Sequence, residues 1–154
     1  MITITIADLK KQRLFCDLDD AELAVVAQKV QVEQYPMGSA IFREGEPTRG
    51  LCLIRSGKIE VSKTTPDGWK QTLAVLTERH FFGELSVIED RKTHSTNTTA
   101  LETTDLYRIT TEDFKELECS HPVMMYKIMK TMARMASRNV HSMNDKLVKA
   151  LISY

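Results

Sequence analysis

All six glycines of this 154-residue chain lie between Gly38 and Gly83. Around them, from Gln31 to about Tyr107, short runs rich in apolar and β-branched residues are separated by turn-forming residues, a pattern typical of strands. Within one such run, the apolar residues at 59 and 61 alternate with polar residues at 58, 60 and 62, as expected of a half-buried strand. Several short strands with this spacing predict a mainly β domain, folded as a jelly-roll-like barrel or sandwich.

Turn signals predict which strands are neighbours. Ser56-Gly57 and Pro66-Asp67-Gly68 each lie between two strand-like runs. Residues of these types form the tight turns that join antiparallel strands. We therefore expect both segments to be hairpin loops.

Helices are predicted on both sides of the β region. Before it, residues up to Leu14 favour a short helix. Asp19 and Glu22 have the spacing of a capping box, which predicts a helix from there to about Val30. After it, Thr110 is a suitable N-cap for a further helix. The fold class is therefore mainly β with flanking α.

The final helix is the longest predicted element. Pro122 suits its first position, and the pattern continues to about Ile152, a length of about 45 Å at 1.5 Å per residue. Apolar and small residues recur along it at alternating spacings of four and three: Met129, Ala133, Ala136, Val140, Met143, Leu147, Ala150 and Tyr154. This heptad seam predicts a parallel two-chain coiled coil, and an amphipathic helix packed on its own domain is the alternative. A second stripe is expected to face the barrel: Ile128, Met132 and Met135.

The charge balance argues against a general polyanion-binding protein, because 21 basic side chains face 21 acidic ones. The distribution is uneven, since six Lys or Arg and one acidic residue follow His121. These basic residues are spread around the heptad seam. We therefore expect them to form a solvated helix face and not a nucleic-acid contact.

The sequence carries no sign of metal binding, export or catalysis. Cys16, Cys52 and Cys119 lack metal-ligand spacing, which favours reduced thiols in a cytoplasmic protein. No export signal and no run of roughly 18 apolar residues is present, so we expect no contact with a membrane. His94 and Ser95 are neighbours whose side chains point to opposite faces of an extended segment, and no nucleophile or phosphate-loop motif occurs. We expect neither an enzyme nor a bound metal or cofactor.

The segment Gly83-Glu84-Leu85 carries the predicted binding site. It has the pattern of a tight glycine turn into a short helix, and the unpaired N–H groups at a helix start attract anions such as phosphate. A carboxylate beside a phosphate needs another role, and Glu84 is suited to accept hydrogen bonds from a sugar hydroxyl. An anion site next to a sugar site predicts a nucleotide. The alternative for Glu84 is a favourable interaction with the helix dipole alone.

At this point the chain resembles the cyclic-nucleotide-binding domains, in particular the sensor half of the bacterial catabolite activator proteins. Residues 42–46 and 54–61 match the family's early strands, and residues 83–85 match the opening of its phosphate cassette, with the activator's spacing to Ala100. The resemblance extends from about residue 14 to about residue 140. It implies a double-stranded β-helix barrel with N-terminal helices over residues 1–120. Residues 121–154 of the same domain would form a C-terminal helix that dimerises and lies across the nucleotide pocket.

The resemblance also implies the ligand contacts: Gly83, Glu84, Leu85, His94, Ser95, Thr96 and Asn139. His94 occupies the position of the family's phosphate-binding arginine, and Asn139 that of a threonine that contacts the base. A histidine is mostly neutral at pH 7, so a charged hydrogen bond worth roughly 1.5–3 kcal/mol is lost. We therefore expect weak nucleotide binding or another small anion. If His94 binds the phosphate, affinity rises as pH falls through about 6.5; an exposed loop histidine without a ligand is the alternative.

We thus expect a small-molecule sensor that binds a cyclic purine nucleotide, cyclic AMP or cyclic GMP, and signals through its homodimer helix to an unknown downstream protein. The alternative is a dimeric protein-interaction module with a ligand-free pocket, and a haem sensor ranks third. In the family, DNA is read by a helix-turn-helix domain that follows this helix. Because the sequence stops at Tyr154, we expect either a stand-alone sensor or part of a longer protein.

Overall fold

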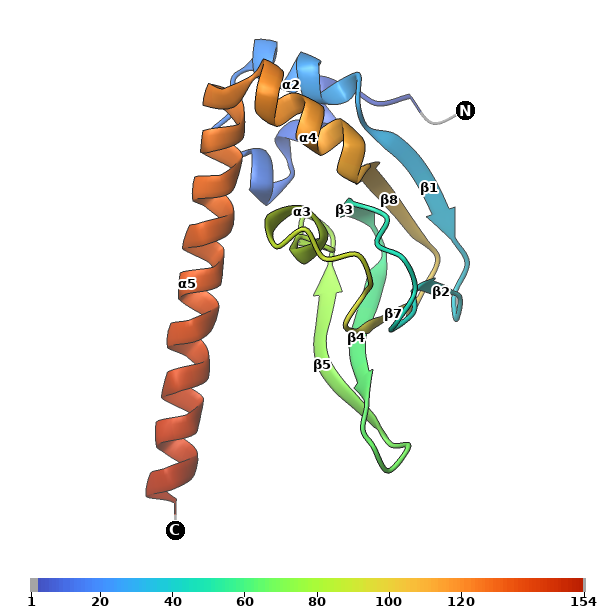
Figure 1. Ribbon diagram of the computed structural model, residues 1–154, viewed down its shortest axis with the longest axis vertical. Helices are drawn as coiled ribbons and strands as arrows, with labels where there is room; N and C mark the ends of the chain where they lie inside the picture. The colour runs from blue at the N-terminus through green and yellow to red at the C-terminus, as the bar shows by residue number, and fades with distance from the viewer. Residues whose placement is uncertain (1–2, 154) are drawn as a thin grey trace.

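The computed structural model describes residues 3–153 as two four-stranded antiparallel sheets with flanking helices (Figure 1). The sheets have strand orders β1-β8-β3-β6 and β2-β7-β4-β5. The strands are β1 (Gln31–Tyr35), β2 (Ala40–Phe42), β3 (Leu51–Ser56), β4 (Lys58–Thr64), β5 (Lys70–Thr77), β6 (Phe81–Phe82), β7 (Asn97–Ala100) and β8 (Thr104–Ile109). The predicted jelly-roll fold is confirmed. Each strand pairing lies within one sheet, so the described strands form two sheets that are not closed into a barrel.

Helices flank the β region as predicted, and those that follow Asp19 and Thr110 or start at Pro122 begin at the predicted positions. They are α1 (Ile6–Lys10), the 3₁₀ turn η1 (Arg13–Phe15), α2 (Asp20–Ala27), α3 (Leu85–Ile88), α4 (Thr111–Ser120) and α5 (Pro122–Ile152). The capping box is formed, because the Glu22 amide donates to the Asp19 carboxylate at 2.8 Å and the Asp19 amide donates to Glu22 at 3.1 Å. Thr110 caps α4 by accepting from the Asp113 amide at 3.1 Å.

Helix α2 is shorter than predicted, since it ends at Ala27 and not near Val30. The amides of Gln28 and Lys29 donate to carbonyls three residues earlier, at 3.2 and 2.9 Å. Such bonds tighten the last turn of a helix and end it. The chain then enters β1 at Gln31.

The prediction that Ser56-Gly57 forms a hairpin loop is wrong. Strand β3 before it pairs with β6 and β8, whereas β4 after it pairs with β5 and β7. Gly57 therefore carries the chain from one sheet to the other. Its φ is +102°, and an added Cβ would lie 2.8 Å from the carbonyl oxygen of Thr103, in the turn that crosses back. Only glycine tolerates both the conformation and this close approach.

The second predicted hairpin is confirmed, because Pro66-Asp67-Gly68 joins the paired strands β4 and β5. The alternation expected along β4 holds only in part. A register shift occurs between Val61 and Ser62, and Ser62 is 2% exposed although it was expected to face solvent. A bulge adds one residue to a strand and so changes which face the following side chains occupy.

Two apolar clusters form the core. One packs the helices on the sheet that contains β3 and β8, and it includes Phe15, Phe114, Ile128 and Met132. The other is built on Phe42 and other residues of both sheets. Burying a side chain of this size contributes about 1.5–3 kcal/mol. The second stripe of the final helix therefore faces the domain as predicted, with Met135 half-buried at its end.

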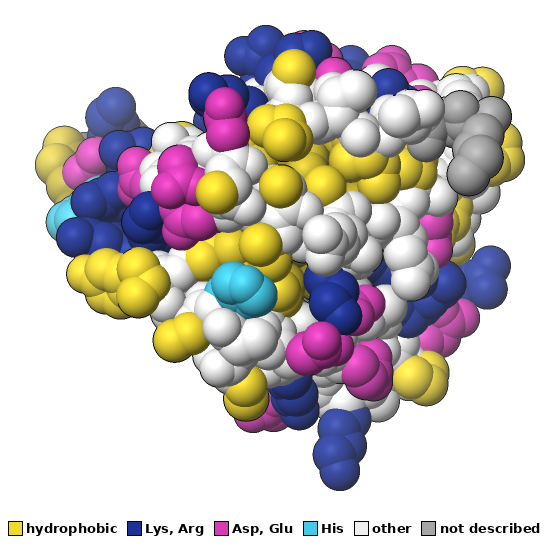
Figure 2. All heavy atoms as spheres, turned by 90° about the horizontal axis from the view of Figure 1, so that it is seen from above, with side chains coloured by type: hydrophobic (Ala, Val, Ile, Leu, Met, Phe, Trp, Pro, Cys, Tyr) yellow, Lys and Arg dark blue, Asp and Glu magenta, His cyan; other side chains and the backbone are white. Residues whose placement is uncertain are grey.

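Helix α5 begins beside the other helices, and its C-terminal part extends away from them (Figure 1). Every described residue of the chain from 136 to 153 is exposed. Within residues 3–153, no helix is long and apolar enough to cross a membrane. Basic and acidic side chains are interspersed on the face seen from above in Figure 2.

Candidate functional site

Gly83 forms the turn between β6 and α3. Its φ of +79° lies in the left-handed region. A Cβ at this position would lie 2.6 Å from the carbonyl oxygen of Gly50 and 3.2 Å from the ring of Phe42. Any other residue would be strained by the backbone conformation and would collide with Gly50. The predicted glycine turn into a short helix is confirmed.

The backbone itself uses part of the hydrogen-bonding capacity of this turn. The amides of Val87 and Ile88 donate to the Glu84 carbonyl at 3.1 and 2.9 Å. Those of Glu84 and Leu85 donate to no backbone carbonyl outside regular elements within residues 3–153. The Glu84 amide bonds the carboxylate of its own side chain, so an anion at this turn would meet fewer unpaired amides than the four at the start of a regular helix.

The Glu84 carboxylate is half-buried and caps no helix amide. It has no ion-pair partner in the part of the chain that the structure describes. Burial raises the pKa of this carboxyl. Its own backbone amide is the one group that opposes this rise, so hydroxyl groups of a ligand would stabilise the charged carboxylate further.

His94 is fixed by its backbone and by its ring. Its amide donates to the Glu46 carbonyl, and its carbonyl accepts from the Gly45 amide, both at 2.9 Å. The imidazole is stacked on Phe42, with ring centroids 3.9 Å apart and planes 14° apart. Phe42 in turn packs edge-to-face with Phe82, with the ring centroids 5.5 Å apart. His94 is thus a half-buried member of an aromatic group and not an exposed loop histidine.

The environment of His94 disfavours its charged form. Burial is the main cause that lowers its pKa, Arg49 acts in the same direction, and Glu46 opposes them. The ring is therefore neutral at pH 7. Its Nε2 atom is buried and has no hydrogen-bond partner within residues 3–153. A rise in anion affinity caused by protonation would consequently occur below pH 6.5 and not through it, because the pKa lies below its usual value.

Three further predicted residues lie near these groups in the chain. Leu85 is half-buried at the first position of α3. Ser95 and Thr96 are half-buried in the bend that leads from His94 into β7. The start of β7 is fixed where the Glu44 amide donates to Asn97 Oδ1 at 2.9 Å. The structure therefore brings Gly83 and His94 together through Phe42, with both hydroxyl side chains adjacent to His94.

Asn139 does not join this group within the single chain. It lies on the exposed part of α5, which Figure 1 shows running apart from the sheets. A contact between Asn139 and a ligand would require another placement of the helix or a second chain.

Phe42 is the residue that sequence reasoning missed. It contacts both Gly83 and His94, and it lines a cavity of about 250 Å³ over β2, β4 and β7 that none of the seven predicted residues lines. In the sequence, the match of residues 42–46 to an early strand of the family makes Phe42 a strand residue. It gives no sign of which residues its ring contacts, since those lie far along the chain.

Comparisons with known proteins show which family this fold belongs to. The model of the cyclic nucleotide-binding domain family matches residues 32–119, more than half of the chain. The cyclic AMP receptor protein of Thermus thermophilus is 30% identical over 126 residues, which cover 82% of this chain and 58% of that protein. The solved catabolite activator protein of Thermus thermophilus has a TM-score of 0.75 at 29% identity and covers 88% of this chain and 62% of its own.

A solved cyclic nucleotide-binding domain from Methylobacillus flagellatus has a TM-score of 0.79 at 23% identity, covering 93% of this chain and 80% of its own. This likeness shows the shared fold. The chain spans less than two thirds of the length of its Thermus thermophilus relatives. Because the family model matches residues 32–119 and the fold is shared, the chain belongs to the cyclic nucleotide-binding domain family.

Proposed function

We propose that this domain is a sensor that binds a cyclic purine nucleotide, cyclic AMP or cyclic GMP, and signals through α5. The observation that carries the proposal is the Glu84 carboxylate, half-buried beside the Gly83 turn without an ion-pair partner within residues 3–153. Similarity to a cyclic AMP receptor protein and to a cAMP-activated global transcriptional regulator supports a regulatory role and not a catalytic one.

Each group at the site has a role in this proposal. Glu84 accepts hydrogen bonds from the ribose hydroxyls. The amide of Leu85 binds the cyclic phosphate together with the hydroxyls of Ser95 and Thr96. His94 contributes at most one neutral hydrogen bond at pH 7, so the affinity is lower than a permanent cation would give.

In this proposal, helix α5 transmits the signal by pairing with a second copy of the chain. Val140, Met143 and Leu147 of the predicted seam are 55%, 68% and 59% exposed, and the last seam position, Tyr154, lies outside the described residues. Pairing with α5 of a second copy would bury these side chains. A ligand that contacts Asn139 favours one placement of the helix over another, and this differential affinity is sufficient for a switch.

Replacement of the Glu84 charge tests the proposal. Glu84→Gln keeps the shape of the side chain, and we expect titration calorimetry with cyclic AMP and cyclic GMP to show at least about tenfold weaker binding. The matched control is Glu118→Gln, on the exposed surface of α4, which leaves the affinity unchanged. Equal affinities of Glu84→Gln and the parent protein would contradict the role of Glu84.

The stack of His94 on Phe42 favours a second candidate, a protein-interaction module without a ligand, because these rings occupy space beside Gly83. Thermal melts separate the two functions. A ligand that binds only the folded state raises the melting temperature by mass action. An unchanged melting temperature in millimolar cyclic mononucleotides and dinucleotides would support the interaction module.

A further inference from the structure

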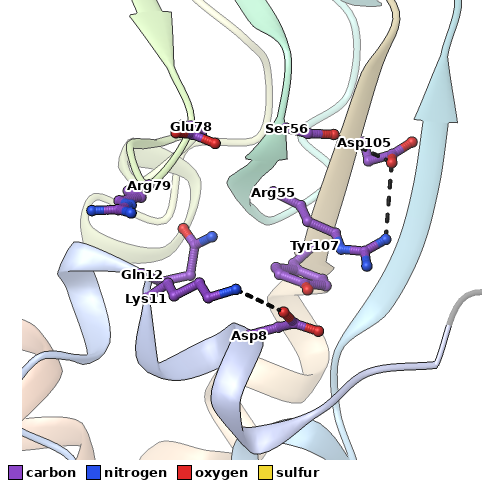
Figure 3. Close-up of a pocket in the computed structure, with 9 residues that line it drawn as sticks. All are labelled: Asp8, Lys11, Gln12, Arg55, Ser56, Glu78, Arg79, Asp105 and Tyr107. Atoms are coloured by element: carbon purple, nitrogen blue, oxygen red, sulfur yellow. Dashed lines mark hydrogen bonds and ion pairs between the residues drawn. The ribbon is translucent and has the colours of Figure 1, made fainter.

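A second cavity, of about 430 Å³, opens between the N-terminal helices and the ends of β3, β5 and β8 (Figure 3). Its volume is typical of small-molecule sites. None of the predicted nucleotide-binding residues lines it. It is therefore a separate site from the one proposed above.

Gln12 presents a fixed hydrogen-bond acceptor to this cavity. The side chain is 3% exposed, and its Nε2 donates to the Ile54 carbonyl at 3.0 Å. A carbonyl can only accept, so this bond determines which end of the amide is the nitrogen. The Oε1 atom is buried and has no partner within residues 3–153. Leaving such an acceptor unpaired is unfavourable, and a ligand donor would remove this cost.

Tyr107 presents a donor across the cavity from Gln12 (Figure 3). The residue is fully buried, its ring belongs to the core between helices and sheet, and its hydroxyl proton has no acceptor among the described residues. Burial raises the pKa of this hydroxyl, and the nearby Arg55 guanidinium only partly opposes the rise. The phenol is therefore protonated at neutral pH and can donate its proton to a ligand acceptor.

Both signs of charge line the cavity equally. Lys11 Nζ lies 3.3 Å from the Asp8 carboxylate, and Arg55 lies 3.9 Å from Asp105. Within each pair, the two opposite charges partly neutralise each other. An ion of a single sign would meet as much repulsion as attraction there.

Glu78 and Arg79 add one acid and one base that form no ion pair with any residue of the described part of the chain. Both lie at the edge of the cavity in the loop after β5. Figure 3 shows Glu78 and Arg79 on the same side as the buried acceptor of Gln12, and the Arg55 guanidinium on the side of the buried donor of Tyr107. A neutral polyol would satisfy the buried groups but leave the Glu78 carboxylate without a partner.

We propose that this cavity binds a small zwitterion that carries an ammonium group and a carboxylate, of the class of free α-amino acids. The ammonium group donates to Gln12 Oε1 and is attracted by Glu78. The carboxylate accepts from the Tyr107 hydroxyl, with the Arg55 guanidinium on the same side of the cavity (Figure 3). Because Glu78 and Arg79 precede β6 and Gly83 in the chain, the two sites are joined by a short segment.

The twenty L-α-amino acids at 10 mM are the probes, first in thermal melts and then in calorimetry. We expect at least one to bind saturably. Its N-acetyl derivative, which lacks the ammonium group, and its carboxamide, which lacks the carboxylate, should each bind about tenfold more weakly or worse. Failure of all twenty, or equal binding of either derivative, overturns the proposal.

The variant Tyr107→Phe tests whether the amino acid binds in this cavity. It removes the unpaired hydroxyl and keeps the buried ring, so the fold is retained. We expect it to weaken amino-acid binding about tenfold and to leave cyclic AMP binding unchanged. The matched control is Tyr126→Phe, which removes a hydroxyl from a residue of α5 that is 62% exposed and leaves both affinities unchanged. Amino-acid binding that is equal in Tyr107→Phe and the control refutes this site.

Discussion

The imidazole of His94 lies nearly parallel to the phenyl ring of Phe42, with the ring centroids 3.9 Å apart. The same phenyl ring contacts Gly83, where an added Cβ would lie 3.2 Å from it. A cyclic phosphate that binds to both Gly83 and His94 must therefore accommodate or displace Phe42. This relationship connects the affinity of the site with the packing of one aromatic side chain.

Shortening this side chain is expected to raise nucleotide affinity. Phe42→Leu removes the stacking partner of His94 and opens space beside Gly83. We expect a loss of about 1–2 kcal/mol in the free energy of unfolding and severalfold tighter binding of cyclic AMP in calorimetry. Phe114→Leu, at a buried position in α4, should lower stability similarly without tighter binding. Equal affinities of the two variants would show that Phe42 does not restrict the site.

The pKa of His94 predicts a pH dependence of stability. Because burial lowers this pKa in the folded state, the unfolded chain binds a proton more readily as pH falls below about 6.5. The stabilisation from neutral His94 is fully present above pH 6.5 and is lost as pH falls through the folded-state pKa. Between pH 7 and pH 5, urea unfolding should therefore show a smaller decrease in the free energy of unfolding for His94→Asn than for the parent. His141→Asn, on the exposed part of α5, should behave as the parent does.

The turn at Gly83 should be intolerant of any side chain. Gly83→Ala places a Cβ 2.6 Å from a backbone oxygen at a φ of +79°. We expect the free energy of unfolding to fall by at least about 2 kcal/mol. Gly68 has a similar φ of +86° with open space around it, so Gly68→Ala should cost about 1 kcal/mol. Denaturant unfolding measures both. Equal losses would indicate that conformation alone, and not the contact with Gly50, requires glycine at position 83.

The exposed seam of α5 predicts a homodimer that one charge can disrupt. Met143→Lys places an ammonium group among side chains that pairing would bury, and an unpaired buried charge is strongly unfavourable. Sedimentation equilibrium should show the mass of a dimer for the parent and that of a monomer for the variant. Ser142→Lys, one residue away and off the seam, should remain dimeric. A monomeric parent protein would refute the coiled coil.

The features that local sequence determined are those that depend on neighbouring residues. Asp19 and Glu22 cap α2 because both partners lie within one turn of each other. Pro122 begins α5 because its fixed φ suits the first helical position. Gly83 turns the chain because only glycine adopts its backbone conformation without strain.

Tertiary structure decided what depends on contacts far along the chain. Ser56-Gly57 has the composition of a hairpin, yet the pairing of β3 with β8 and of β4 with β7 makes it a crossing between sheets. The stack of Phe42 on His94 and the cavity between Gln12 and Tyr107 likewise join residues that no short pattern relates. Periodicity indicates which face of an element is buried, and capping indicates where a helix begins. Which side chains meet there depends on how the sheets and helices pack, and packing is a property of the whole fold.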